Sequence, residues 1–83
     1  MDKLLVNIYI PALKKNYDMF IPNFLPIGTV IELIGQMIEE VSDHKYISSG
    51  QEFLCSVDKN ILLKQNMTLQ EYGVRNGEHM LFC

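Results

Sequence analysis

The residues best suited to chemistry are two cysteines, Cys55 and Cys83, and two histidines, His44 and His79. A thiolate beside an imidazole could act as a nucleophile, and a set of thiols and imidazoles could bind zinc. The sequence has no CxxC pair, and no motif places a nucleophile beside a histidine. We therefore expect reduced thiols that pack as small apolar groups, surface histidines, and no catalytic residues, metal or cofactor.

Two adjacent carboxylates, Glu39 and Glu40, are the other candidates for acid and base chemistry. Neighbouring residues on a helix point about 100° apart, so these side chains cannot converge on one substrate atom. We interpret them as part of a solvated helix face and predict that the protein is not an enzyme.

Composition narrows the class of partner. The chain has 83 residues, a net charge of -3, and Arg75 as its only arginine. A chain of this length forms one domain with a modest core, and an acidic protein lacks the basic face that nucleic acid requires. No apolar run reaches the roughly 20 residues of a membrane span, and MDKLLVNIYI lacks the features of a signal peptide. We expect a cytoplasmic protein with protein partners.

Two segments near the N-terminus predict a hairpin. Apolar residues alternate from Lys3 to Ile10, which is typical of a half-buried strand. The segment PALKKN suits an exposed turn, and a second alternating run from Tyr17 ends at Pro22.

A change of period then predicts a helix. Thr29 and Glu32 have the spacing of a capping box, so we expect the helix to begin there. Apolar residues recur at i, i+4, i+7 and i+11, which predicts a core face of Val30, Ile34, Met37 and Val41.

Two short apolar runs after the helix, 52–57 and 61–63, flank the turn residues 58–60 and predict a second hairpin. Alternation alone would bury Phe53, Cys55 and Val57.

The last sixteen residues contain two turn signals before a final strand. Thr68 and Glu71 repeat the capping-box spacing, and Gly73 is suited to end that single helical turn. Asn76 and Gly77 both tolerate positive φ and predict a reversal into the strand EHMLFC. This order of elements favours an α+β fold, the β-grasp, in which a mixed sheet of four or five strands wraps around one long helix.

The segment TLQEYGV, residues 68–74, resembles the TLxDYxI segment of ubiquitin, and the order of elements agrees along the whole chain. YGVRNGE, YDMFIP and VIELI resemble segments of the bacterial YukD/EsaB group of ubiquitin-like proteins. The resemblance implies a single ubiquitin-like domain over residues 1–83. It also implies a role in type VII (ESX-like) secretion, through contacts with protein partners at the cytoplasmic side of a membrane machine.

Modifiers and sulfur carriers with this fold end in a flexible Gly-Gly tail, whereas this sequence ends at Cys83 inside the predicted strand. We therefore expect a protein that is not conjugated. A ubiquitin-like adaptor unrelated to secretion is the alternative, and a modifier or sulfur carrier is a further one.

The resemblance also implies roles for individual residues. Tyr72 should bond to the backbone of residues 63–66 and stabilise the fold. The last strand should turn Met80 and Phe82 toward the helix, which leaves His79, Leu81 and Cys83 on an open face for protein contacts. Cys55 joins that face if Leu54 is buried, as the resemblance implies, and leaves it if simple alternation holds.

Overall fold

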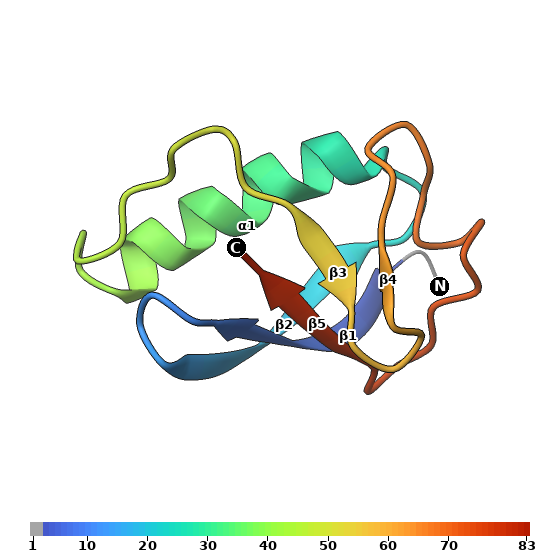
Figure 1. The fold of residues 1–83 in the computed structure, drawn as a ribbon, viewed down its shortest axis with the longest axis horizontal. Helices are drawn as coiled ribbons and strands as arrows, with labels where there is room; N and C mark the ends of the chain where they lie inside the picture. The colour runs from blue at the N-terminus through green and yellow to red at the C-terminus, as the bar shows by residue number, and fades with distance from the viewer. Residues whose placement is uncertain (1–2) are drawn as a thin grey trace.

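The computed structural model describes residues 3–83 and contains one helix above a five-stranded sheet (Figure 1). The helix is α1 (Ile27–Val41), and the strands are β1 (Lys3–Ile10), β2 (Lys15–Pro22), β3 (Leu54–Ser56), β4 (Ile61–Leu62) and β5 (His79–Phe82). The strand order is β2-β1-β5-β3-β4; β1 and β5 run parallel and the other neighbours are antiparallel. This is the predicted β-grasp.

The first hairpin follows its sequence pattern closely. Its pairing runs without a bulge from Lys3 opposite Pro22 to Ile10 opposite Lys15. The even-numbered residues Val6, Ile8 and Ile10 are buried, as their alternation predicts. These side chains form the floor of the core beneath α1.

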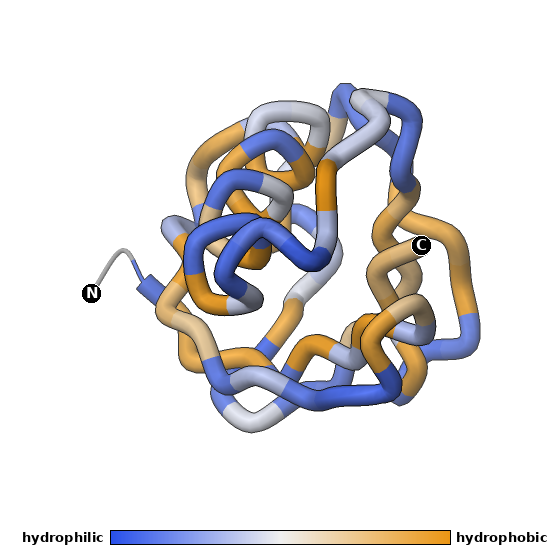
Figure 2. Tube along the Cα trace, turned by 90° about the vertical axis from the view of Figure 1, so that its left-hand side faces the viewer, coloured by the Kyte–Doolittle hydropathy of each residue, from blue (hydrophilic) through white to orange (hydrophobic). Residues whose placement is uncertain are grey.

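The helix turns a different stripe toward the sheet from the one that the sequence predicts. Ile27, Ile31, Ile34 and Ile38 are buried together with Val30. Met37 and Val41, which were expected in the core, are 36% and 57% exposed. The predicted spacing of i, i+4, i+7 and i+11 is correct, but the buried set starts at Ile27, the first residue of the helix, and not at Val30. In Figure 2, hydrophobic and hydrophilic segments alternate along the chain.

The predicted capping box of Thr29 and Glu32 is wrong, since Pro26 is the N-cap and no side chain caps the helix. The first free N–H groups are satisfied instead by the loop before Thr68. Ile27 N donates to Met67 O at 2.8 Å, and Gly28 N donates to Gln65 O at 3.0 Å. A cap supplied by a distant loop leaves no local signature in the sequence.

Strand β3 settles the orientation of Cys55. Leu54 and Ser56 are each 1% exposed, whereas Phe53 and Val57 are 50% and 56% exposed. The alternation that would bury Phe53, Cys55 and Val57 is therefore wrong, and the orientation implied by the resemblance is correct. Polar residues on the inner side explain the error, because Glu52 and Ser56 are buried and a hydropathy pattern assigns them to the surface.

The turn before β5 has the predicted reciprocal cap and a glycine terminus. Thr68 N donates to Glu71 Oε1 at 3.0 Å, and Glu71 N donates to Thr68 Oγ1 at 3.1 Å. Gly73 has φ 70°, and the backbone bonds Gly73 N to Gln70 O and Val74 N to Leu69 O form a Schellman motif.

The second reversal uses its two residues differently from the prediction. Gly77 has φ 86°, but Asn76 does not take a positive φ. Asn76 contributes its side chain instead, since its Oδ1 accepts a hydrogen bond from Leu5 N at 2.8 Å. Gly77 N donates to Leu5 O at 2.7 Å, so the turn is attached to β1 just before β5 begins its parallel pairing.

Candidate functional site

The outer surface of β3 and β5 brings together all four residues that the sequence assigns to a contact face. Three antiparallel pairs occupy it: Cys83 opposite Phe53, Leu81 opposite Cys55, and His79 beside Val57. Phe53 and Cys83 are joined by two backbone hydrogen bonds, of 2.6 and 3.1 Å. Side chains of directly opposite residues lie on the same side of a sheet. Met80 and Phe82, each 1% exposed, point to the core as expected.

The strands on either side extend this surface. Tyr9 of β1 is in register with Leu81, and Leu62 of β4 is in register with Cys55. A row of four side chains, Tyr9, Leu81, Cys55 and Leu62, therefore crosses four strands. We define the open face as this row together with its neighbours Phe53, Val57, His79 and Cys83. The segments near the C-terminus are mostly hydrophobic in Figure 2.

The open face is hollowed at its β4 end. A depression of about 330 Å³ is lined by Cys55, Ser56, Val57, Asn60, Ile61, Leu62 and Leu81. Its walls are predominantly apolar, and it is open to solvent on one side. A depression of this shape can receive an apolar side chain but holds no constellation for catalysis.

Tyr9, Phe53, Val57 and Leu62 belong to the open face and were missed in the sequence. A signal existed for three of them. Phe53 and Val57 share the period of Cys55, so the three residues had to share one side of the strand. Leu62 lies within the run 61–63, and a strand with two faces cannot bury three consecutive residues.

Cys55 is poorly suited to nucleophilic chemistry. Burial raises the pKa of the Cys55 thiol, and a thiolate charge on the neighbouring Cys83 would raise it further, so Cys55 stays protonated at neutral pH. Cys83 is exposed, and both cysteines are free thiols. They supply polarisable apolar surface to the open face.

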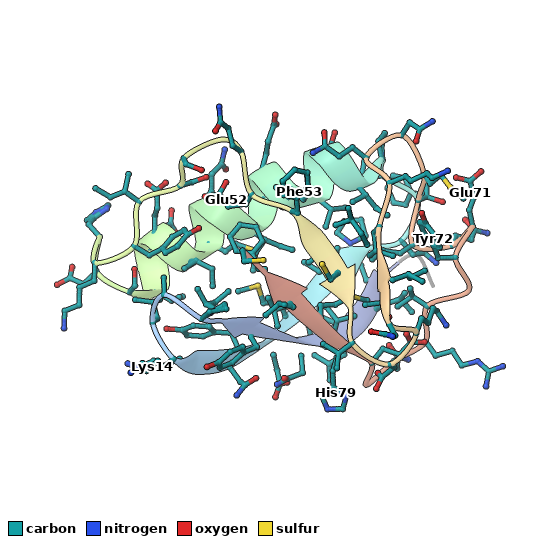
Figure 3. The ribbon with its side chains drawn as sticks, in the orientation of Figure 1. Lys14, Glu52, Phe53, Glu71, Tyr72 and His79 are labelled. Carbon is teal, nitrogen blue, oxygen red and sulfur yellow. The ribbon has the colours of Figure 1, made fainter. Side chains whose placement is uncertain are left out.

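His79 lies at the polar border of the open face. Its backbone N–H donates to Asp58 Oδ2 at 2.7 Å, and its Nδ1 lies 3.3 Å from the same oxygen. The His79 N–H holds the pKa of the Asp58 carboxyl below its usual range. The side chain projects from the lower edge of the molecule (Figure 3). The carboxylate of Asp58 and the imidazole of His79 thus form a polar border beside an apolar surface.

The structural residues named from the sequence lie elsewhere. Tyr72 Oη accepts a hydrogen bond from Lys64 N at 2.9 Å, within the segment 63–66 that was predicted. Tyr72 and Glu71 appear together beside that segment in Figure 3. The turn at Thr68, Glu71 and Gly73 and the reversal at Gly77 both precede β5, so these residues position the open face without forming it.

Within residues 3–83, no group of three or more histidine, cysteine or acidic side chains is arranged to hold a metal ion. No helix in the same range is long and apolar enough to cross a membrane.

The fold and the open face define a ubiquitin-like β-grasp protein, and solved structures agree. The ubiquitin-like domain of the Mycobacterium tuberculosis type VII secretion system protein ECCD1 matches with a TM-score of 0.77 and 19% identity over 99% of this chain and 98% of that one. The ubiquitin of Caldiarchaeum subterraneum matches with a TM-score of 0.72 and 16% identity over 96% and 90%. At these identities the likeness establishes the fold alone.

A third solved structure, the MycP5-free ESX-5 inner membrane complex in State II, contains a chain that matches with a TM-score of 0.73 and 15% identity. The match covers 100% of this chain and 21% of that one, so the similar domain is one part of a much longer protein. No curated protein matches the sequence.

The sequence itself matches the family described as WXG100 protein secretion system (Wss), protein YukD, over residues 5–81. The chain belongs to this family of secretion-system components.

Proposed function

We propose that this protein serves WXG100 secretion as a non-conjugated interaction component, which binds a protein partner through the open face. The observation that carries the proposal is the row formed by Tyr9, Leu81, Cys55 and Leu62 in a member of the YukD family. Four strands position these side chains, so the surface is presented as a rigid unit. A preorganised surface binds with a smaller entropic cost than one that must be ordered on binding.

The chemistry of the open face favours a protein partner. Apolar side chains at its centre and polar groups such as Asp58 and His79 at its border reproduce the usual anatomy of a protein interface. The depression beside Leu62 suits one apolar anchor residue of the partner. We expect no enzymatic activity, because the open face offers contact area and no reactive pair.

We propose a membrane component of the secretion machine as the partner, engaged on the cytoplasmic side. The ESX-5 inner membrane complex supports this choice, because a similar domain forms about a fifth of one of its chains. A separate protein of the same fold could dock to the equivalent machine from the cytoplasm. This arrangement would place the protein at the inner face of the membrane without a span of its own.

The proposal is tested by affinity purification from the source cells with the wild type and Leu81→Asp as baits. A charge at the centre of the open face should abolish recovery of secretion-system membrane components, since an unpaired buried charge is costly. Ile47→Asp is the matched control, because Ile47 is an exposed apolar residue in the loop after α1. Equal recovery by the wild type and Leu81→Asp would refute the assignment of this surface.

The role in secretion is tested separately from the surface. Recovery of partners unrelated to secretion, lost in Leu81→Asp, would favour the ubiquitin-like adaptor. A covalent adduct in the intact mass of the purified protein would favour a modifier or sulfur carrier. Membrane components recovered with the wild type alone, at unchanged mass, would support the proposed function.

A further inference from the structure

We propose a second binding surface, distinct from the open face: the free edge of β2, which takes an extended segment of a partner protein as an added strand. β2 is the outermost strand on its side of the sheet and is eight residues long (Figure 1). The opposite edge strand, β4, has two residues. Only β2 is long enough to template another strand.

The backbone groups that face the free edge follow from the pairing of β1. Asn7 N donates to Glu78 O, and Gly77 N donates to Leu5 O, so the odd-numbered residues of β1 direct their backbone toward β5. The even-numbered residues of β1 therefore bond to the odd-numbered residues of β2. The N–H and C=O groups of Asn16, Asp18 and Phe20 point outward, and no strand within residues 3–83 pairs with them.

Edges are commonly blocked by bulges, prolines, lysines or inward-pointing charges. Here Lys15 and Pro22 lie at the two ends of β2, and Asp18 is the one charged residue between them. The β1–β2 pairing has no bulge, and Pro22 lies at the far end. Between Asn16 and Ile21, the side chains that face the core are apolar. The side chain of Phe20, on the opposite face of the sheet, is 65% exposed. Residues 16–20 are therefore open to pairing.

An apolar flank of α1 faces the β2 side of the sheet. Leu33, Met37 and Val41 recur at i, i+4 and i+8, and two of them are the residues wrongly expected in the core. The other flank of the helix lies against the loop that leads to β3, where a Cβ on Gly35 would be 2.8 Å from Ser48 Oγ. Leu33, Met37 and Val41 therefore face the β2 side of the sheet. Inward side chains of an added strand would meet them.

The charge at one end of the β2 edge indicates a further property of the partner segment that would bind there. Lys14 and Lys15 are exposed at the turn end of the edge, and Figure 3 shows Lys14 at that end of the molecule. The geometry fits an extended segment of about five residues with apolar side chains at alternate positions, because side chains in a strand alternate between faces. An acidic residue at the end beside the two lysines would complement their charge.

The proposal is tested with a random library of about ten-residue peptides. The peptides are displayed on phage and selected on the immobilised full chain. Selected peptides should show alternating apolar residues with an acidic end, and on binding they should slow amide hydrogen exchange at Asn16, Asp18 and Phe20. Protection on β3 or β5 instead, or failure to select any peptide, would overturn it. Slow exchange of these amides in the free chain, together with a dimer in solution, would show that a second copy occupies the edge and would equally overturn it.

The matched pair Asp18→Pro and Asp18→Ala tests the backbone directly. Proline removes an outward N–H without removing a bond to β1, whereas alanine removes only the side chain. Asp18→Pro should weaken the selected peptide about tenfold, and Asp18→Ala should leave its affinity within about twofold. Phe20→Pro with Phe20→Ala repeats the comparison if Asp18→Pro fails to fold. Leu81→Asp should bind the peptide normally, because Leu81 lies on the open face and not at the edge of β2. Failure of the edge-strand proposal therefore leaves the proposed function intact.

Discussion

Tyr72 accepts a hydrogen bond from the backbone N–H of Lys64 at 2.9 Å and so joins the turn before β5 to the segment after β4. The same segment caps α1 through Gln65 O and Met67 O. A side chain of the last turn thus stabilises the loop on which the helix terminus depends.

We predict that Tyr72→Phe lowers the free energy of unfolding by about 1 kcal/mol, since the Lys64 N–H loses its partner. In a domain of this size the melting temperature should fall by roughly 4 to 8 °C. Tyr9→Phe, which removes a hydroxyl from another half-buried tyrosine, is the control. An unchanged melting temperature in Tyr72→Phe would show that the bond contributes nothing.

We predict that Gly73→Ala destabilises the fold by about 1 kcal/mol. Gly73 has φ 70°, and an added Cβ would meet nothing within 4 Å, so the cost arises from the backbone conformation alone. Gly73→Asn should cost less, because asparagine tolerates this conformation better. Urea unfolding of the three proteins measures the difference, and equal stabilities of Gly73→Ala and the wild type would contradict the prediction.

Glu52 should make the stability of the fold depend on pH. Glu52 is 5% exposed, and its carboxylate accepts hydrogen bonds from Tyr46 Oη, Ser48 Oγ and Ser49 N. Burial opposes ionisation, but these donors outweigh it and lower the pKa below the ordinary 4.5. The unfolded chain therefore takes up the proton first, and the stability that Glu52 contributes is lost as pH falls through the folded-state pKa.

Urea unfolding between about pH 7 and pH 3 should show this loss in the wild type and a shallower pH dependence in Glu52→Gln. Glu40→Gln removes an exposed carboxyl from α1 and is the control. The same pH dependence in Glu52→Gln and the wild type would mean that Glu52 is not responsible.

The sequence predicts the fold because hairpins, amphipathic period and glycine turns are local signals. It misplaces the start of α1 because the N-terminal cap comes from Gln65 and Met67, far along the chain. The predicted core stripe also starts at Val30 and not at Ile27, so it includes Met37 and Val41, which are exposed.

The candidate site could be predicted in part, where it depends on local signals in the sequence. The resemblance to ubiquitin-like proteins turns Met80 and Phe82 to the core, and the structure has them buried with Leu81 between them on the other side of β5. Alternation alone is less reliable. It fails for β3 because Glu52 is buried with hydrogen-bond donors from Tyr46, Ser48 and Ser49, which hydropathy cannot anticipate. Strand order places Tyr9 beside Leu81 and Leu62 beside Cys55, and strand order is a property of the whole fold.

The central claim is that the open face contacts the secretion machine. A photo-crosslinking amino acid placed at position 81, and separately at Ile47, tests it inside the source cells. We predict that position 81 crosslinks to a membrane component of the secretion system and that position 47 does not. Crosslinking of that component from position 47 and not from 81, or from neither, would contradict the account.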